Sequence, residues 1–170
     1  MCECYYIQMS INAPIYPYVD IPPETLREIE TKRARKIVFT FGAFDLLNSA
    51  HMRLLNYCRK NGDVLVVGLY TDAAVHTVTN DENRPINELK ERVACLREFG
   101  LVDYIYQLDG NNTIDIVDLL RPDVIVIGEN NKHGADICSG EVITARIDLF
   151  KHVNFVSTTS TISRVCERYL

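Results

Sequence analysis

Short apolar runs alternate, from residue 36 onward, with segments whose apolar residues recur every three or four positions. The runs predict buried strands, and the helical spacing predicts helices packed against them. We expect strands at about 36–41, 63–70, 102–108, 123–128 and 152–156, and helices at about 49–60, 72–78, 87–99, 113–120, 139–150 and 157 to the C-terminus. This alternation predicts an α/β fold with a doubly wound, five-stranded parallel sheet.

Residues 1–35 do not follow this pattern. Prolines at positions 14, 17, 22 and 23 interrupt any regular element there, yet the segment is more apolar than a disordered tail. We therefore expect an N-terminal arm at 1–35, with a short helix near 22–30, that packs on its own domain or on a second subunit. Residues 36–170 then form the α/β domain.

Composition narrows the class of protein. The chain has 170 residues and a net charge of −5, which argues against nucleic acid as the main partner. It holds no apolar run of about 18 residues, so we expect no membrane span. Six scattered cysteines indicate free thiols in a reducing, cytoplasmic setting. Metal binding by Cys2 and Cys4 would need ligands from elsewhere, and no matching Cys or His pair is visible.

The stretch at residues 40–51 is a strand-to-helix turn with the composition of an anion site. Gly42 gives the turn backbone freedom, and Asn48 or Ser49 is placed to cap the helix that follows. Free N–H groups at a helix N-terminus bind anions, most often phosphate. A strand order of 3-2-1-4-5 would bring this turn together with the polar turns at 128–132 and 157–162. Such a cluster of turns suits a triphosphate.

These segments resemble the cytidylyltransferase-like nucleotidyltransferases, which carry G-x-F-D-x-x-H-x-G-H after their first strand. Residues 42–51 read GAFDLLNSAH, and 84–87, 91–92 and 157–159 match later family motifs. The resemblance spans about 36–168. It is greatest for the sugar-phosphate branch, which includes the adenylyltransferase domain of bacterial heptose synthesis and the glycerol-3-phosphate and ethanolamine-phosphate cytidylyltransferases.

The resemblance implies a Rossmann-like nucleotidyltransferase fold and transfer of a nucleoside monophosphate from ATP or CTP to a phosphorylated sugar or alcohol. Pyrophosphate would leave, Mg²⁺ would be bound, and the protein would be a homodimer. The catalytic residues that it implies are His51, Asn48, Arg84 and Arg92. The nucleotide-binding residues that it implies are Thr40, Phe41, Gly42, Ala43, Phe44, Asp45, Ala50, Gly128, Glu129, Asn130, Ser157, Thr158, Thr159, Ser160, Thr161 and Ile162.

Three departures from the family pattern bear on catalysis. The first motif histidine is Asn48, the motif glycine is Ala50, and the loop at 76–81 has no lysine. Asparagine is a shorter and always neutral donor, and loss of one preorganised donor typically costs on the order of 10²–10³ in rate. Asn48 also has a simpler interpretation as a helix cap, and Asp45 as a turn residue.

Three hypotheses follow from the sequence. The first is a working transferase, slowed or retuned by these changes. The second is a nucleotide-binding regulatory or scaffolding protein without catalysis, and the third is a protein-interaction domain without a ligand.

Overall fold

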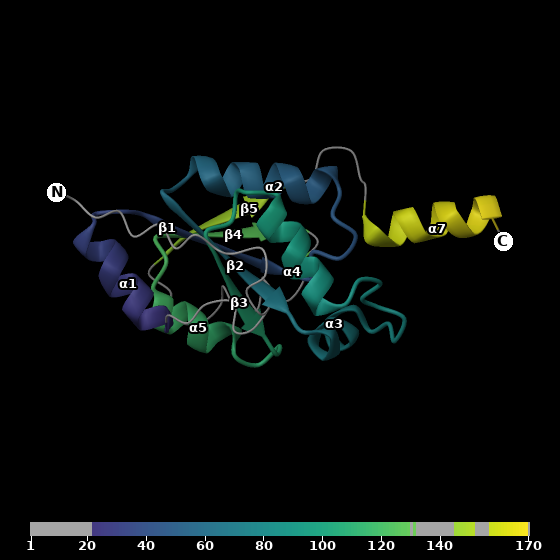
Figure 1. The fold of residues 1–170 in the computed structure, drawn as a ribbon, viewed down its shortest axis with the longest axis horizontal. Helices are drawn as coiled ribbons and strands as arrows, with labels where there is room; N and C mark the ends of the chain where they lie inside the picture. The colour runs from purple at the N-terminus through teal and green to yellow at the C-terminus, as the bar shows by residue number, and fades with distance from the viewer. Residues whose placement is uncertain (1–21, 130, 132–144, 152–156, 170) are drawn as a thin grey trace.

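The computed structural model describes residues 22–129, 131, 145–151 and 157–169. Its centre is a five-stranded parallel sheet in the order β3-β2-β1-β4-β5, with helices on both faces (Figure 1). The strands are β1 (Ile37–Gly42), β2 (Val64–Tyr70), β3 (Tyr104–Leu108), β4 (Val124–Gly128) and β5 (Arg146–Phe150). The predicted fold class and strand order are confirmed.

The helices divide between the two faces of the sheet, and α7 extends away from it (Figure 1). α1, α3 and α5 contribute to the apolar cluster on one face, and α2 and α4 to the cluster on the other. None of the described helices is long and apolar enough to cross a membrane. The helices are α1 (Pro23–Lys32), α2 (Ser49–Lys60), α3 (Asp72–Thr79), α4 (Leu89–Glu98), α5 (Thr113–Leu120) and α7 (Thr158–Tyr169).

The central strands are apolar on both sides because both faces of the sheet are covered. All seven residues of β2 are buried, as its continuous apolar run predicts. On β1, Phe39 and Phe41 stack in one cluster with ring centroids 5.7 Å apart, whereas Val38 belongs to the other. Successive side chains of one strand therefore serve two cores, as the two-residue period requires.

The last strand differs from the prediction. Residues 146–150 form β5, although we expected a helix over 139–150, and the strand expected at 152–156 lies outside the described residues. Ile147 and Leu149 alternate with Arg146 and Asp148, which is the period of a strand. β5 pairs only with β4 in the described sheet, so it keeps polar residues that a central strand would lack.

Part of the predicted arm belongs to the fold. α1 packs against α5, and Leu26 is fully buried in the same cluster as β1 and β4. Arg27 also donates to Asp123 at the start of β4, at 2.9 Å, and Asp123 accepts the Ile37 amide at 2.8 Å. Residues 22–32 are thus a structural helix of the domain, whereas residues 1–21 lie outside the described part of the chain.

Replacing Leu26 with alanine tests whether α1 is integral to the domain. We expect Leu26→Ala to lower the free energy of unfolding by about 2–5 kcal/mol, because it leaves a cavity in the core. Chemical denaturation measures the change, with Glu28→Ala on the exposed face of α1 as the control. Equal stability of the two variants would show that α1 is not part of the core.

Candidate functional site

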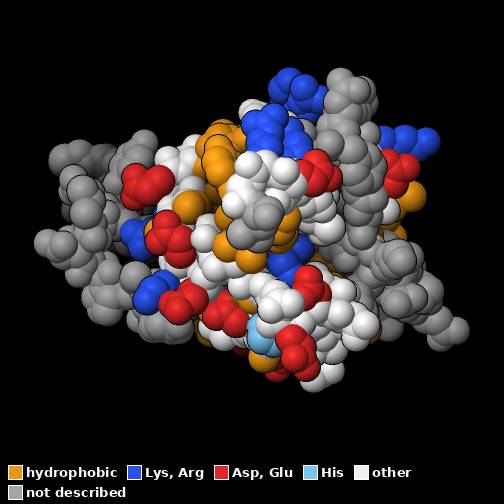
Figure 2. Space-filling view, turned by 90° about the vertical axis from the view of Figure 1, so that its right-hand side faces the viewer, with side chains coloured by type: hydrophobic (Ala, Val, Ile, Leu, Met, Phe, Trp, Pro, Cys, Tyr) orange, Lys and Arg blue, Asp and Glu red, His pale blue; other side chains and the backbone are white. Residues whose placement is uncertain are grey.

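A cavity of about 470 Å³ opens at the carboxyl ends of β1 and β4, where the strand order reverses. The turn after β1, the ends of β2 and β4, α3 and the start of α7 all contribute residues to its wall. The three turns that we expected to converge, at 42–51, 128–132 and 157–162, all contribute described residues to this cavity. Figure 2 faces the side on which α7 projects and shows acidic and basic side chains mixed over the described surface.

The turn after β1 has an unusual backbone. Phe44 and Leu46 have φ angles of 48° and 45°, in the left-handed region that costs non-glycine residues energy. Gly42, which we expected to provide the conformational freedom, is the last residue of β1 and is not among the residues with positive φ. The two left-handed residues flank Asp45, which is 1% exposed. The turn therefore directs the Asp45 carboxylate into the protein.

Asp45 holds the loop between α3 and α4. Its carboxylate accepts hydrogen bonds from Arg84 Nε at 2.8 Å and from the amides of Ile86 at 2.9 Å and Asn87 at 3.0 Å. Burial by itself would raise the pKa of Asp45, but the donors from Asn87, Ile86 and Arg84 outweigh it and lower the pKa below its usual range. Asp45 is consequently ionised and has a structural role, but its side chain binds the loop at 84–87 and not the backbone of its own turn.

Arg84 lies on the cavity wall and is 8% exposed. Among the described residues, its guanidinium donates one hydrogen bond, from Nε to Asp45. The two terminal nitrogens are then left to bind an anion in the cavity. This position agrees with a role in contacting a phosphate, which stays a prediction.

Arg92 occupies a different position. Its side chain is fully buried, and it donates to the carbonyl oxygens of Ala43 at 2.6 Å, Tyr70 at 2.7 Å and Asn87 at 3.0 Å. A further bond of 2.7 Å goes to Asp72. Arg92 is not part of the cavity wall, so its expected contact with phosphate or acceptor has no geometric support here. The geometry favours a supporting role behind the site.

Asn48 is the N-cap of α2. Its Oδ1 accepts hydrogen bonds from the amides of Ala50 at 3.0 Å and His51 at 3.3 Å. These two amides are therefore not the free donors that we expected at this helix N-terminus. The amides are bound because the extended backbone at Asn48 brings its short side chain back over the first turn of α2.

His51 completes this capping arrangement. Its Nδ1 accepts the amide of Asn48 at 3.3 Å, and its ring lies 5.4 Å from that of Phe44. Because Nδ1 is an acceptor, the neutral imidazole carries its proton on Nε2. His51 also lines the cavity, and its Nε2–H is the group that would donate to a phosphate there.

The start of α7 forms another wall of the cavity. Thr158 donates from Oγ1 to the carbonyl oxygen of Asp45 at 2.6 Å. Ser157 and Ser160 cap each other's backbone: Ser157 Oγ accepts the Ser160 amide at 3.0 Å, and Ser160 Oγ accepts the Ser157 amide at 2.9 Å. These side chains cap the start of α7, so the Ser160 amide is used within the protein.

The structure brings together most of the residues named from the sequence. Those on the cavity wall are Phe41, Gly42, Ala43, Phe44, Asp45, Asn48, Ala50, His51, Arg84, Gly128, Ser157, Thr158 and Thr159. Those that are described but not on the wall are Thr40, Arg92, Glu129, Ser160, Thr161 and Ile162. Asn130 lies outside the described residues. Their roles in binding stay predictions.

Several wall residues were not named as site residues. Asn131 donates from Nδ2 to the Phe41 carbonyl at 3.2 Å and so links the ends of β4 and β1. The polar loop after β4 was a signal for it. The other unnamed wall residues are Leu54, Tyr70, Val75, Val78, Thr79 and Asp81. Most of these follow β2, which the predicted order places beside β1.

The cavity has few fixed positive charges. Arg84 is the only lysine or arginine among the described residues of its wall. The segment 76–81, which lacks the expected lysine, is not a loop throughout, because α3 runs to Thr79 and Asp81 follows it. Within the described ranges, no group of three or more His, Cys, Asp or Glu side chains is placed to hold a metal ion. A phosphate chain would therefore depend on a few specific donors.

The parallel sheet, with its cavity where the strand order reverses, defines an α/β domain of the doubly wound class. A family model described as "Cytidylyltransferase-like" matches residues 39–164. The chain belongs to this cytidylyltransferase-like family.

Curated relatives are longer proteins. The chain is 35% identical over 153 residues to the bifunctional protein HldE of Syntrophotalea carbinolica, covering 86% of this chain and 31% of that protein. It is 37% identical over 141 residues to HldE of Citrifermentans bemidjiense, covering 83% and 28%. The chain thus spans about a third of the length of the relatives it matches.

Solved structures support the fold. A lipopolysaccharide core biosynthesis protein from Thermoplasma volcanium matches with a TM-score of 0.56 and 24% identity, covering 72% of this chain and 99% of that chain. Pantoate-beta-alanine ligase from Francisella tularensis matches with a TM-score of 0.59 and 14% identity, covering 84% and 71%. At these identities the likeness concerns the fold alone.

The supporting position of Arg92 can be tested by substitution. We expect Arg92→Lys to lower the free energy of unfolding by about 2–4 kcal/mol, because one ammonium cannot satisfy the acceptors that the guanidinium fork reaches. Denaturant unfolding measures the loss. Arg97→Lys, a partly exposed arginine on the same helix, is the matched control, and an equal, small effect of both would contradict the proposed support.

Proposed function

We propose that this domain transfers a nucleoside monophosphate from a nucleoside triphosphate to a phosphorylated sugar. ATP is the donor we favour, since the sequence resemblance is greatest for the branch that includes the adenylyltransferase domain of bacterial heptose synthesis, and the relatives compared above are bifunctional HldE proteins. The observation that carries the proposal is the convergence of the 42–51 turn, Arg84 and the start of α7 on one cavity. A phosphorylated alcohol as acceptor and CTP as donor are the alternatives within the same chemistry.

The reaction needs positioning more than covalent chemistry. A phosphate oxygen of the acceptor attacks the α-phosphorus of the nucleotide, the bond from that phosphorus to the bridging oxygen breaks, and pyrophosphate leaves. The attacking oxygen is already anionic, so no general base is required. Arg84 and His51 would donate to phosphate oxygens from the cavity wall, and the first turn of α7 would add backbone donors.

Mg²⁺ fits this site as a companion of the phosphates. The described acidic residues on the wall are Asp45, whose carboxylate already accepts three hydrogen bonds, and Asp81. Mg²⁺ often binds through substrate phosphates, waters and only one or two carboxylates, so this residue set suits it. When bound, the ion would neutralise charge on the triphosphate. Asp81 is the residue that would help to hold it.

A second candidate function is nucleotide binding without catalysis. It is favoured by Asn48, which occupies two amides at the start of α2, and by the absence of a lysine from residues 76–81. Both features reduce the positive potential available to a phosphate chain. Homodimer formation and a cytoplasmic location are expectations that accompany either candidate.

A ligand screen separates these candidates. We expect Mg²⁺-ATP to raise the melting temperature more than Mg²⁺-CTP, -GTP or -UTP, because binding to the native state stabilises it. Pyrophosphate should then be released only when a phosphorylated sugar is added. Binding without release across sugar phosphates, glycerol 3-phosphate and ethanolamine phosphate would favour the non-catalytic candidate. No shift with any nucleotide would refute both.

Restoring the motif histidine tests whether the site is a working one. We expect Asn48→His to raise the rate of pyrophosphate release at least about tenfold, because imidazole adds a stronger donor to the phosphates. Asn61→His, at the C-terminal end of the same helix, is the control and should not change the rate. An Asn48→His protein with no more activity than the parent would argue against catalysis.

A further inference from the structure

Asp45 contacts both sides of the cavity through two different groups. Its carboxylate accepts Arg84 Nε and the amides of Ile86 and Asn87, on the loop between α3 and α4. Its carbonyl oxygen accepts Thr158 Oγ1 at 2.6 Å, at the start of α7. One buried residue therefore joins two wall segments that are far apart in the sequence.

The bonds to Asp45 determine where Arg84 can act. An arginine held only by packing can adopt many rotamers, whereas a bond from Nε to a buried carboxylate fixes the plane of the guanidinium. The Ile86 and Asn87 amides fix the loop that carries Arg84. The terminal nitrogens of Arg84 are thereby given a single direction relative to the cavity wall.

The carbonyl side of Asp45 acts in the same way on α7. Thr158 is 7% exposed and is the one buried residue among those described in α7, whereas residues 163–169 are all exposed. Its bond to Asp45 thus anchors the buried end of a helix that otherwise projects away from the domain (Figure 1). The positions of Thr158 and Arg84 depend on the same residue.

We propose that Asp45 is a positioning residue that holds Arg84 and the start of α7 in register, so that both contact the same phosphate chain. This inference rests on the proposed function for the identity of the ligand. Three hydrogen bonds within the protein hold the Asp45 carboxylate, so its role here is to position other residues. Its effect on binding passes through Arg84 and Thr158.

A double-mutant cycle measures this dependence. We expect Asp45→Asn to weaken binding of Mg²⁺-ATP at least about tenfold in calorimetry, and Arg84→Gln to weaken it by a similar factor. In the double variant the loss should be within about twofold of the larger single loss, because a misdirected Arg84 contributes little. Losses that multiply would show that the two residues act independently and would overturn the proposal.

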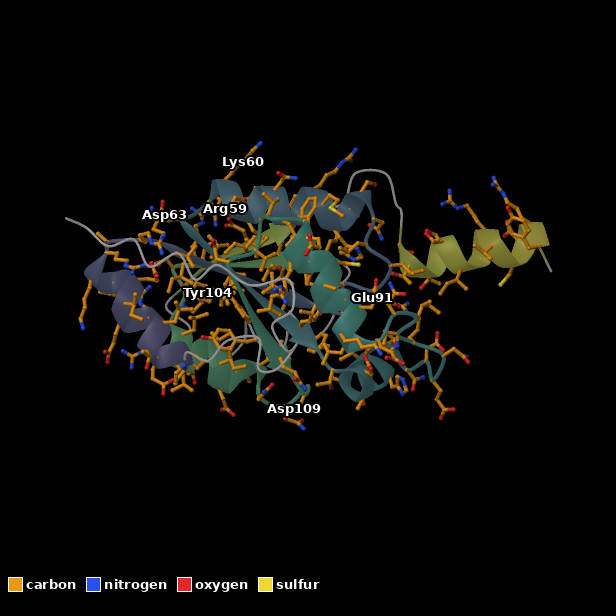
Figure 3. All side chains as sticks on the ribbon, viewed as in Figure 1. Arg59, Lys60, Asp63, Glu91, Tyr104 and Asp109 are labelled. Atoms are coloured by element: carbon orange, nitrogen blue, oxygen red, sulfur yellow. The ribbon has the colours of Figure 1, made fainter. Side chains whose placement is uncertain are left out.

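Asp103→Asn is the matched control for a general loss of stability. Asp103 likewise accepts an arginine, Arg59, together with a backbone amide, that of Leu65 at 2.7 Å. Figure 3 shows Arg59 near the end of α2 that is remote from α7. Asp103→Asn should therefore lower the melting temperature but change the affinity for Mg²⁺-ATP less than about twofold. An affinity loss equal to that of Asp45→Asn would contradict a specific positioning role.

A second measurement needs no nucleotide and so separates this inference from the proposed function. We expect Thr158→Val, which removes one hydroxyl from the Asp45 carbonyl, to speed amide hydrogen exchange at Ile86 and Asn87 about threefold or more. Unchanged exchange there would refute the coupling, even if the protein binds ATP. Faster exchange in a protein that binds no nucleotide would retain the coupling and reject the proposed ligand.

Discussion

The interior at the carboxyl end of the sheet depends on one constraint: a charged side chain that is buried must find hydrogen-bond partners. Asp45 and Arg92 are both buried, and both find partners in the segment 84–88, which lies between two helices and has no strand or helix of its own. Asp45 accepts two of its amides, and Arg92 donates to the Asn87 carbonyl. The two charged residues also bind an oppositely charged partner each, so both are satisfied despite burial.

Residues of the same type have different positions in this arrangement: one faces the cavity, and the other supports the site from behind. Arg84 and Arg92 carry the same charge and lie eight residues apart, yet one lines the cavity and the other is enclosed by carbonyl oxygens. Asn48 and His51, in contrast, share both roles: Asn48 caps α2, His51 accepts the Asn48 amide, and both line the cavity. Asn48, which stands where the family has a histidine, therefore has a structural role. The turn keeps its shape with a neutral side chain at this position.

Much of the fold was predictable because the spacing of apolar residues along the chain reflects which positions are buried. The alternation of apolar runs and helical spacing predicted four of the five strands and the doubly wound parallel sheet. β5 was assigned wrongly because Arg146 and Asp148 made an edge strand resemble part of a polar helix. The short helix near 22–30 was predicted to pack on its own domain or on a second subunit, and only the structure shows that Leu26 belongs to the core of this domain.

The sequence by itself determined the family pattern, the sheet and the turns that meet at its carboxyl end, because these follow from local spacing and from the rule for parallel sheets. Only the tertiary structure decided which charged groups face the cavity. Asp45 is turned inward by left-handed residues on either side, and Arg92 by its place on the buried face of α4. Such orientations depend on contacts between residues 42 to 113 positions apart in the chain, which no local pattern records.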